Sequence, residues 1–101
     1  GFREAIRLGR RAVNLAPENP ETLRFLAELY GTTGFYGPAF GIWQRYAEAG
    51  GALDDAAKGE VASSGTQVGY ARYGQGDLPG ALSAYRTVTR LVPENVRAQR
   101  W

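Results

Sequence analysis

The amino-acid sequence predicts an all-α protein, an α-solenoid of about five to six helices arranged as repeated antiparallel pairs. Two observations lead to this prediction. The tripeptide Pro-Glu-Asn at residues 17–19 recurs at residues 93–95, and each copy follows a helical pattern. Apolar residues recur at three- and four-residue steps through most of the chain, which is the period of amphipathic helices. Repeats of this kind pack on their neighbours and leave a long surface free for binding.

The first two helices are predicted over residues 2–15 and from residue 20 onward. In the first, an apolar stripe faces one way and four arginines fall largely elsewhere, and Pro17 follows its end. Asn19 is placed to cap the second helix, with Pro20 at its first position. The apolar positions of this second helix are Leu23, Leu26, Ala27 and Tyr30. The sequence Gly-Thr-Thr-Gly at residues 31–34 then favours a turn.

The later helices follow the same pattern. A third begins at residue 36 or 37 and ends at the Gly-Gly pair 50–51, and a fifth runs from about residue 79 to 91. Between them, Asp54 or Asp55 can cap a fourth helix that reaches about Tyr73, although glycines at positions 59, 65 and 69 each cost it roughly 1 kcal/mol relative to alanine. We interpret the two aspartates as helix caps and not as an acid–base pair. Asn95 is expected to cap a final partial helix that ends at Trp101.

The register of these helices resembles the tetratricopeptide repeat (TPR) family, whose period is 34 residues. A shift of 34 residues superimposes Phe2 on Tyr36 and Ala5 on Ala39. The residues that carry the resemblance are Leu23, Leu26, Ala27, Tyr30, Gly34, Tyr36, Ala39 and Trp43. The resemblance implies a right-handed solenoid with a half repeat (1–19), a full repeat (20–53), an insertion (54–61), another full repeat (62–95) and the start of a further unit (96–101).

The departures from the family pattern lead to two expectations about the fourth helix. Eight inserted residues amount to about two helical turns, so we expect a lengthened helix and not a disordered insert. Gly65 stands where the family has a bulky apolar residue, and Arg72 where it has Tyr, so this helix should pack less tightly. We take Gly65 to be exposed, and Gly65→Ala should then stabilise the protein by about 0.4–1 kcal/mol.

Small and aromatic residues at helical spacing are assigned to the core. Ala5, Ala39 and Ala81 sit where the two helices of a pair should approach closely, and larger side chains there would overpack. The aromatic residues assigned to core packing are Trp43, Tyr46 and Tyr85.

Composition limits the chemistry of this chain. The 101 residues include no cysteine and no histidine, which removes thiolate and imidazole chemistry. No apolar run approaches the roughly 18 residues of a membrane span. We therefore expect a soluble domain that is not an enzyme, with no cofactor, no metal and no membrane insertion, and we favour a cytoplasmic location. The net charge of only +2, with acidic residues in every segment, disfavours nucleic acid.

The resemblance implies a protein–protein interaction module or assembly scaffold that binds a peptide or partner helix on the concave face formed by the first helix of each pair. By register, the peptide-binding positions are Glu21, Arg24, Glu28, Thr66, Tyr70, Tyr73, Arg97 and Arg100. Exposed tyrosines would offer flat contact area, and arginines forked donors for carboxylates. A Tyr pair one turn apart can equally be packed against the lengthened helix. Glu28 stands where relatives that clamp a terminal carboxylate carry Asn, which disfavours that ligand.

Two alternative functions stay open. Helical repeats of similar period bind single-stranded RNA, although Glu21 and Glu28 disfavour phosphate contacts. The domain can also select substrates for an enzyme encoded elsewhere in a longer chain. Because the sequence begins inside one repeat and stops inside another, we expect neighbouring repeats in a parent protein, or self-association through exposed array ends. The residues expected at these ends are Phe2, Ile6 and Val13 on one side and Trp101 on the other.

Overall fold

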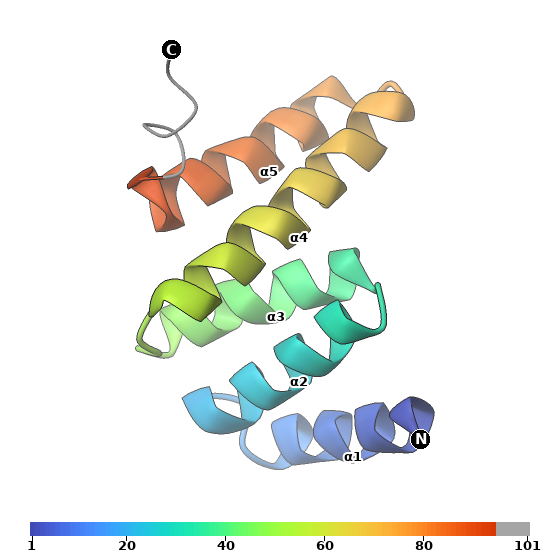
Figure 1. Cartoon of the computed structure of the whole chain (residues 1–101), viewed down its shortest axis with the longest axis vertical. Coiled ribbons are helices and arrows are strands. Elements are labelled where there is room, and N and C mark those ends of the chain that lie inside the picture. Colours follow the sequence, from blue (N-terminus) through green and yellow to red (C-terminus); the bar gives the residue numbers. More distant parts are fainter. Residues whose placement is uncertain (95–101) are drawn as a thin grey trace.

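The computed structural model describes residues 1–94, which form five α-helices and no strand (Figure 1). The helices are α1 (Phe2–Leu15), α2 (Pro20–Thr32), α3 (Tyr36–Glu48), α4 (Asp55–Gly74) and α5 (Leu78–Leu91). The predicted all-α class is confirmed, and the five main helices begin and end within a few residues of their predicted bounds. The partial helix predicted from Asn95 lies outside the described residues.

Local side-chain caps and glycines set the helix ends. Asn19 Oδ1 accepts a hydrogen bond from the Glu21 backbone N–H at 2.9 Å and so caps α2. Asp54 Oδ1 does the same for α4 through the N–H of Ala57, also at 2.9 Å. The turns that follow α2, α3 and α4 each contain a glycine with positive φ, a conformation that other residues adopt only with strain. These glycines are Gly34, Gly50 and Gly76, with φ of 83°, 87° and 79°.

Each helix packs mainly on its neighbours in the sequence. The most extensive contacts join α2 to α3 and α4 to α5, while α1–α2 and α3–α4 contacts link these pairs into one body. Figure 1 shows the helices following one another along the long axis of the molecule, from α1 at one end to α5 at the other. The body measures 41 × 29 × 21 Å. A core made by neighbouring pairs is typical of helical repeats.

The core lies where α2, α3 and α4 meet. Trp43 of α3 is completely buried, and its ring meets the ring of Tyr46 edge to face with centroids 5.4 Å apart. Ala39 and Ala81 are also buried, as expected for close helix crossings, whereas Ala5 is only partly buried. Tyr85 was expected in the core, but 37% of it is exposed, although its ring packs against α4 at Gly69.

The fourth helix is long, as predicted, because residues 55–61 of the proposed insertion form its first turns and Asp54 caps it. Ala57 and Val61 are both completely buried within this segment, so it adds side chains to the core.

The expected exposure of Gly65 is wrong. Gly65 is buried, and a Cβ atom built on it would lie 2.8 Å from Phe40 Cε1 and closer still to Val88 Cγ2. The missing side chain therefore makes room for Val88 of α5, so that α5 lies close to α4 and the pairing is not loose. Arg72 also contributes, since its Nη1 donates a hydrogen bond to the Gly80 carbonyl oxygen at 3.1 Å.

Candidate binding surfaces

Arg24 on α2 is held by neighbouring side chains and only 24% of its side chain is exposed. Its Nη1 and Nη2 atoms donate to the two carboxylate oxygens of Asp54 at 2.9 and 3.2 Å. Its Nε donates to Glu28 Oε2 at 3.4 Å, and Nη1 also donates to the Tyr46 hydroxyl at 3.3 Å. The guanidinium lies 5.7 Å from the centroid of the Trp43 ring, within range of a cation–π contact. Arg24 therefore links α2, α3 and the start of α4.

This network favours the charged forms of both Asp54 and Arg24. The hydrogen bond from Arg24 holds the pKa of Asp54 below its ordinary value, and the Ala57 backbone N–H lowers it further. In return, the hydrogen bond with Asp54, followed by that with the Tyr46 hydroxyl, raises the pKa of Arg24. Asp54 thus caps α4, as predicted, and also anchors Arg24. The ion pair was not predicted, because its members are 30 residues apart in the sequence.

The other predicted positions on α2 surround this network with negative charge. Glu21 and Glu28 are exposed and lie on the same side of the helix as Arg24, because they precede and follow it by three and four residues. A hollow of about 510 Å³ beside Arg24 is also lined by Glu21. With its arginine already paired to carboxylates, this surface is unsuited to an acidic ligand.

The predicted positions on α4 form a separate stripe, in which the two tyrosines are exposed and Thr66 is half-buried. Thr66, Tyr70 and Tyr73 follow at intervals of four and three residues, which places them on one side of the helix. The two tyrosines are 69% and 63% exposed, so they are not packed against the lengthened helix. Within residues 1–94 neither ring pairs with another aromatic ring. We call these three residues the tyrosine stripe.

The structure does not bring Arg24 and the tyrosine stripe into one pocket. Arg24 meets Asp54 just before the first turn of α4, and Tyr70 lies 16 residues further along that helix. At about 1.5 Å per residue the separation along the axis is about 24 Å. Figure 1 shows the C-terminal half of α4 running beside α5 and away from α2. Arg97 and Arg100 lie outside the described residues.

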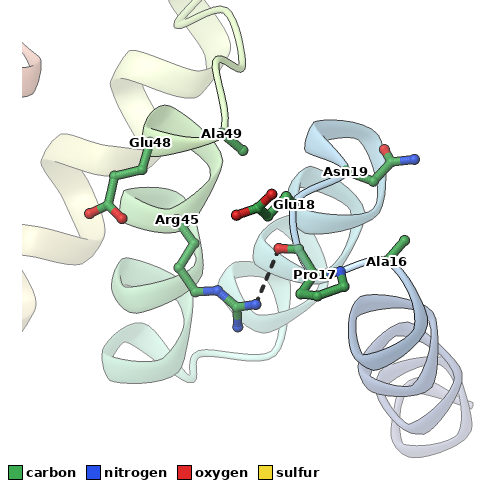
Figure 2. A pocket seen from close by; sticks show the side chains of 7 residues that line it. All are labelled: Ala16, Pro17, Glu18, Asn19, Arg45, Glu48 and Ala49. Carbon is green, nitrogen blue, oxygen red and sulfur yellow. Dashed lines mark hydrogen bonds between the residues drawn. The ribbon is translucent and has the colours of Figure 1, made fainter.

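A hollow of about 770 Å³ lies between the α1–α2 loop and the end of α3 (Figure 2). Arg45 reaches from α3 to this loop, where its Nη2 donates to the Pro17 carbonyl oxygen at 3.3 Å. The other lining residues are Ala16, Glu18, Asn19, Glu48 and Ala49. These include two carboxylates and one guanidinium. No group of three or more acidic residues in residues 1–94 is arranged to hold a metal ion.

A second hollow, of about 710 Å³, lies between α1 and the α2–α3 turn, at a place not predicted from the sequence. Its apolar lining residues are Phe2, Ile6, Tyr30, Phe35 and Pro38, and its basic ones are Arg3, Arg7, Arg10 and Arg11. A smaller hollow of about 140 Å³ continues it between α1 and α3. We call the two together the α1–α3 groove. The only sequence signal for it was the position of the α1 arginines beside the apolar stripe.

Of the residues expected at an exposed array end, Val13 is buried against the core, because its side of α1 faces α2. Ile6 is partly buried, and only Phe2 is largely exposed. Trp101 lies outside the described residues.

Comparison with models of known protein families and with curated proteins finds no match. The resemblance to tetratricopeptide repeats therefore depends on the register of the chain's own residues. No helix in the described part of the chain has the length and apolar character needed to cross a membrane.

Proposed function

We propose that this chain is a protein-interaction module of the tetratricopeptide type, a right-handed solenoid that binds a peptide or partner helix on the concave face shared by α2 and α4. The observation that carries the proposal is the exposure of Tyr70 and Tyr73 on one side of α4. Tyrosine side chains bury much apolar area, lose little rotamer entropy and keep a hydroxyl for hydrogen bonding, so they are frequent anchors of protein interfaces.

The surroundings of the stripe indicate the chemistry of its ligand. Arg24 is already paired with Asp54 and Glu28, so the α2 end of this face presents carboxylates and no available cation. An apolar or aromatic side chain of the ligand would pack between Tyr70 and Tyr73. Basic or neutral groups would suit the α2 end. We expect micromolar affinity, because a short stripe buries little area and the ligand loses conformational entropy on binding.

A peptide library tests this proposal. Random 12-residue peptides displayed on phage would be selected against the whole chain, and the affinity of the recovered sequences measured by fluorescence anisotropy. Tyr70→Ala and Tyr73→Ala should each weaken binding by about 5- to 30-fold, while the melting temperature stays close to that of the unaltered protein. Tyr36→Ala, the same substitution at an exposed position on α3, provides the matched control and should have little effect on binding.

Two results would count against the proposal. Recovered peptides whose affinity is insensitive to both tyrosine substitutions would remove the stripe as the binding surface. Binding of a 15-residue oligouridine, in preference to any peptide and with steep salt dependence, would favour the RNA-binding alternative.

A further inference from the structure

We propose that the α1–α3 groove is a second binding site, separate from the tyrosine stripe, and that it takes an acidic amphipathic helix of a partner protein. The shape, the apolar floor and the basic charge of the groove suit such a helix.

The groove is continuous along α1. Its two hollows share Arg10, Asn14 and Tyr30 as lining residues. The smaller hollow is also lined by Arg45, which lines the hollow at the α1–α2 loop as well. Helices α1 and α3 both pack on α2 but make little contact with each other, so the groove runs between them over α2. Its floor consists of the apolar lining residues of α1, α2, the α2–α3 turn and the start of α3. The 14 residues of α1 give the groove a length of about 21 Å, or nearly four helical turns.

The floor of the groove is apolar and open to solvent. At its wide end, Phe2 and Phe35 are both more than half exposed, and Ile6 lies beside them in the lining. The Phe35 and Tyr30 rings meet edge to face with centroids 6.3 Å apart, so the wide end of the groove is already formed without a ligand. Covering these side chains with the apolar stripe of another helix would remove them from water. Recognition of an amphipathic helix in an apolar groove is a common mode of peptide binding.

The wall of the groove is basic and uncompensated. Arg3, Arg7 and Arg10 follow at intervals of four and three residues, so they form one row along α1. All three are exposed, as is Arg11, and Glu4 is the only acidic residue of the helix. The ion pairs found within residues 1–94 involve other side chains. These guanidinium groups are therefore available for bidentate contacts with carboxylates, unlike that of Arg24.

The combination of floor and wall favours one occupant over others. An acidic helix with an apolar stripe would cover the floor and place carboxylates at helical spacing opposite the arginine row. A second copy of this chain that docked by the same face would bring its own basic α1 to the groove and be repelled. Single-stranded RNA would satisfy the arginines but would leave aliphatic floor residues such as Ile6 and Pro38 without a matching surface.

A designed peptide provides the test. The probe is a fluorescein-labelled 16-residue helix with leucines along one side and glutamates flanking them, and its control has glutamine in place of every glutamate. Anisotropy with the whole chain should give binding that weakens as salt increases. The glutamine peptide should bind at least about tenfold more weakly. Equal affinity of the two peptides would overturn the proposal.

Matched protein variants locate the site. Arg3→Gln combined with Arg7→Gln should weaken binding of the glutamate peptide by about tenfold. The control combines Arg86→Gln with Arg90→Gln, two exposed arginines on α5 with the same four-residue spacing, and should change affinity less than about twofold. Equal loss in both double variants would mean nonspecific attraction and would refute the site. Melting curves would confirm that each variant is folded.

Two further measurements separate this site from its alternatives. Phe35→Ala should weaken binding of the glutamate peptide, since Phe35 forms the floor, whereas Tyr70→Ala should leave it unchanged. Weakening by Tyr70→Ala alone would place the peptide on the tyrosine stripe and overturn the groove proposal without affecting the proposed function. A 15-residue oligouridine that binds the arginine row more tightly than the peptide would assign the groove to RNA instead.

Discussion

Replacing Gly65 with alanine should destabilise the protein, although alanine is the better helix former. The substitution adds one methyl group in the middle of α4, where the helix faces α5 and α3. That methyl carbon would lie 2.8 Å from Phe40 Cε1 and even closer to Val88 Cγ2, whereas carbon atoms in ordinary contact are about 3.5–4.0 Å apart. Phe40 and Val88 are each only 4% exposed, so neither can turn toward solvent to make room.

The magnitude follows from two opposing contributions. Alanine gains about 1 kcal/mol over glycine in a helix interior. Overpacking a buried contact typically costs about 1–3 kcal/mol, and here two buried neighbours must move, which favours the upper part of that range. We therefore expect Gly65→Ala to lower the free energy of unfolding by about 1–2 kcal/mol. Urea denaturation followed by circular dichroism would measure it.

Gly59→Ala is the matched control on the same helix. Gly59 is exposed, and a Cβ atom there would meet no atom within 4 Å, so the substitution should stabilise the protein by about 0.4–1 kcal/mol. Val88→Ala offers an internal check because it removes part of the side chain that the added methyl group would meet. It should lower the free energy of unfolding less in the Gly65→Ala background than in the unaltered protein. If Gly65→Ala stabilises the protein as much as Gly59→Ala, the close crossing of α4 and α5 described above is incorrect.

The Arg24 network leads to two further predictions. Arg24→Ala should lower the free energy of unfolding by about 1 kcal/mol, the sum expected for a partly exposed ion pair and a cation–π contact. As a control, Arg86→Ala should change the free energy of unfolding by less than about 0.5 kcal/mol in the same denaturation assay. If the two substitutions lower it equally, Arg24 has no structural role. Because the pKa of Asp54 is lower in the folded protein than in the unfolded chain, the unfolded state takes up the proton first as pH falls. The stability that Asp54 contributes is therefore complete above its unfolded pKa and is lost below about pH 4. Asp54→Asn keeps a capping side chain but removes the carboxylate that pairs with Arg24. The unfolding free energies of this variant and of the unaltered protein, plotted against pH, should therefore converge in acid. Parallel plots would show that the Asp54 carboxylate does not contribute to stability.

Helix type and helix boundaries could be predicted from the sequence because their causes are local. Asn19 caps α2 through a hydrogen bond to a backbone N–H two residues away, and Pro20 suits the first helical position wherever the helix is packed. Eight residues amount to about two helical turns and nearly preserve the helical phase, which was enough to predict a long α4. The register placed Tyr70 and Tyr73 on one side of α4 but left open whether they are exposed or packed, and the structure shows that they are exposed.

The roles of individual side chains were less predictable, because they depend on which other helix comes close. Gly65 looked like a weak point in α4, and the only hint of close packing was a second glycine four residues later, at Gly69. Arg24 looked like a ligand-binding residue because its partner, Asp54, is far away in the sequence. Proximity of this kind arises only when α2, α3 and α4 pack together.

The sequence by itself therefore determined an all-α chain, its helix ends and the side of each helix on which its tyrosines and arginines lie, since each depends on contacts within one or two turns. Only the tertiary structure decided that Arg24 is paired with Asp54, that Tyr70 and Tyr73 are exposed about 24 Å or more along α4 from this ion pair, and that a basic groove lies between α1 and α3. A groove needs two helices to pack on the same neighbour with space between them. That spacing is set by the packing of side chains from all three helices and is not encoded in the pattern of any one of them.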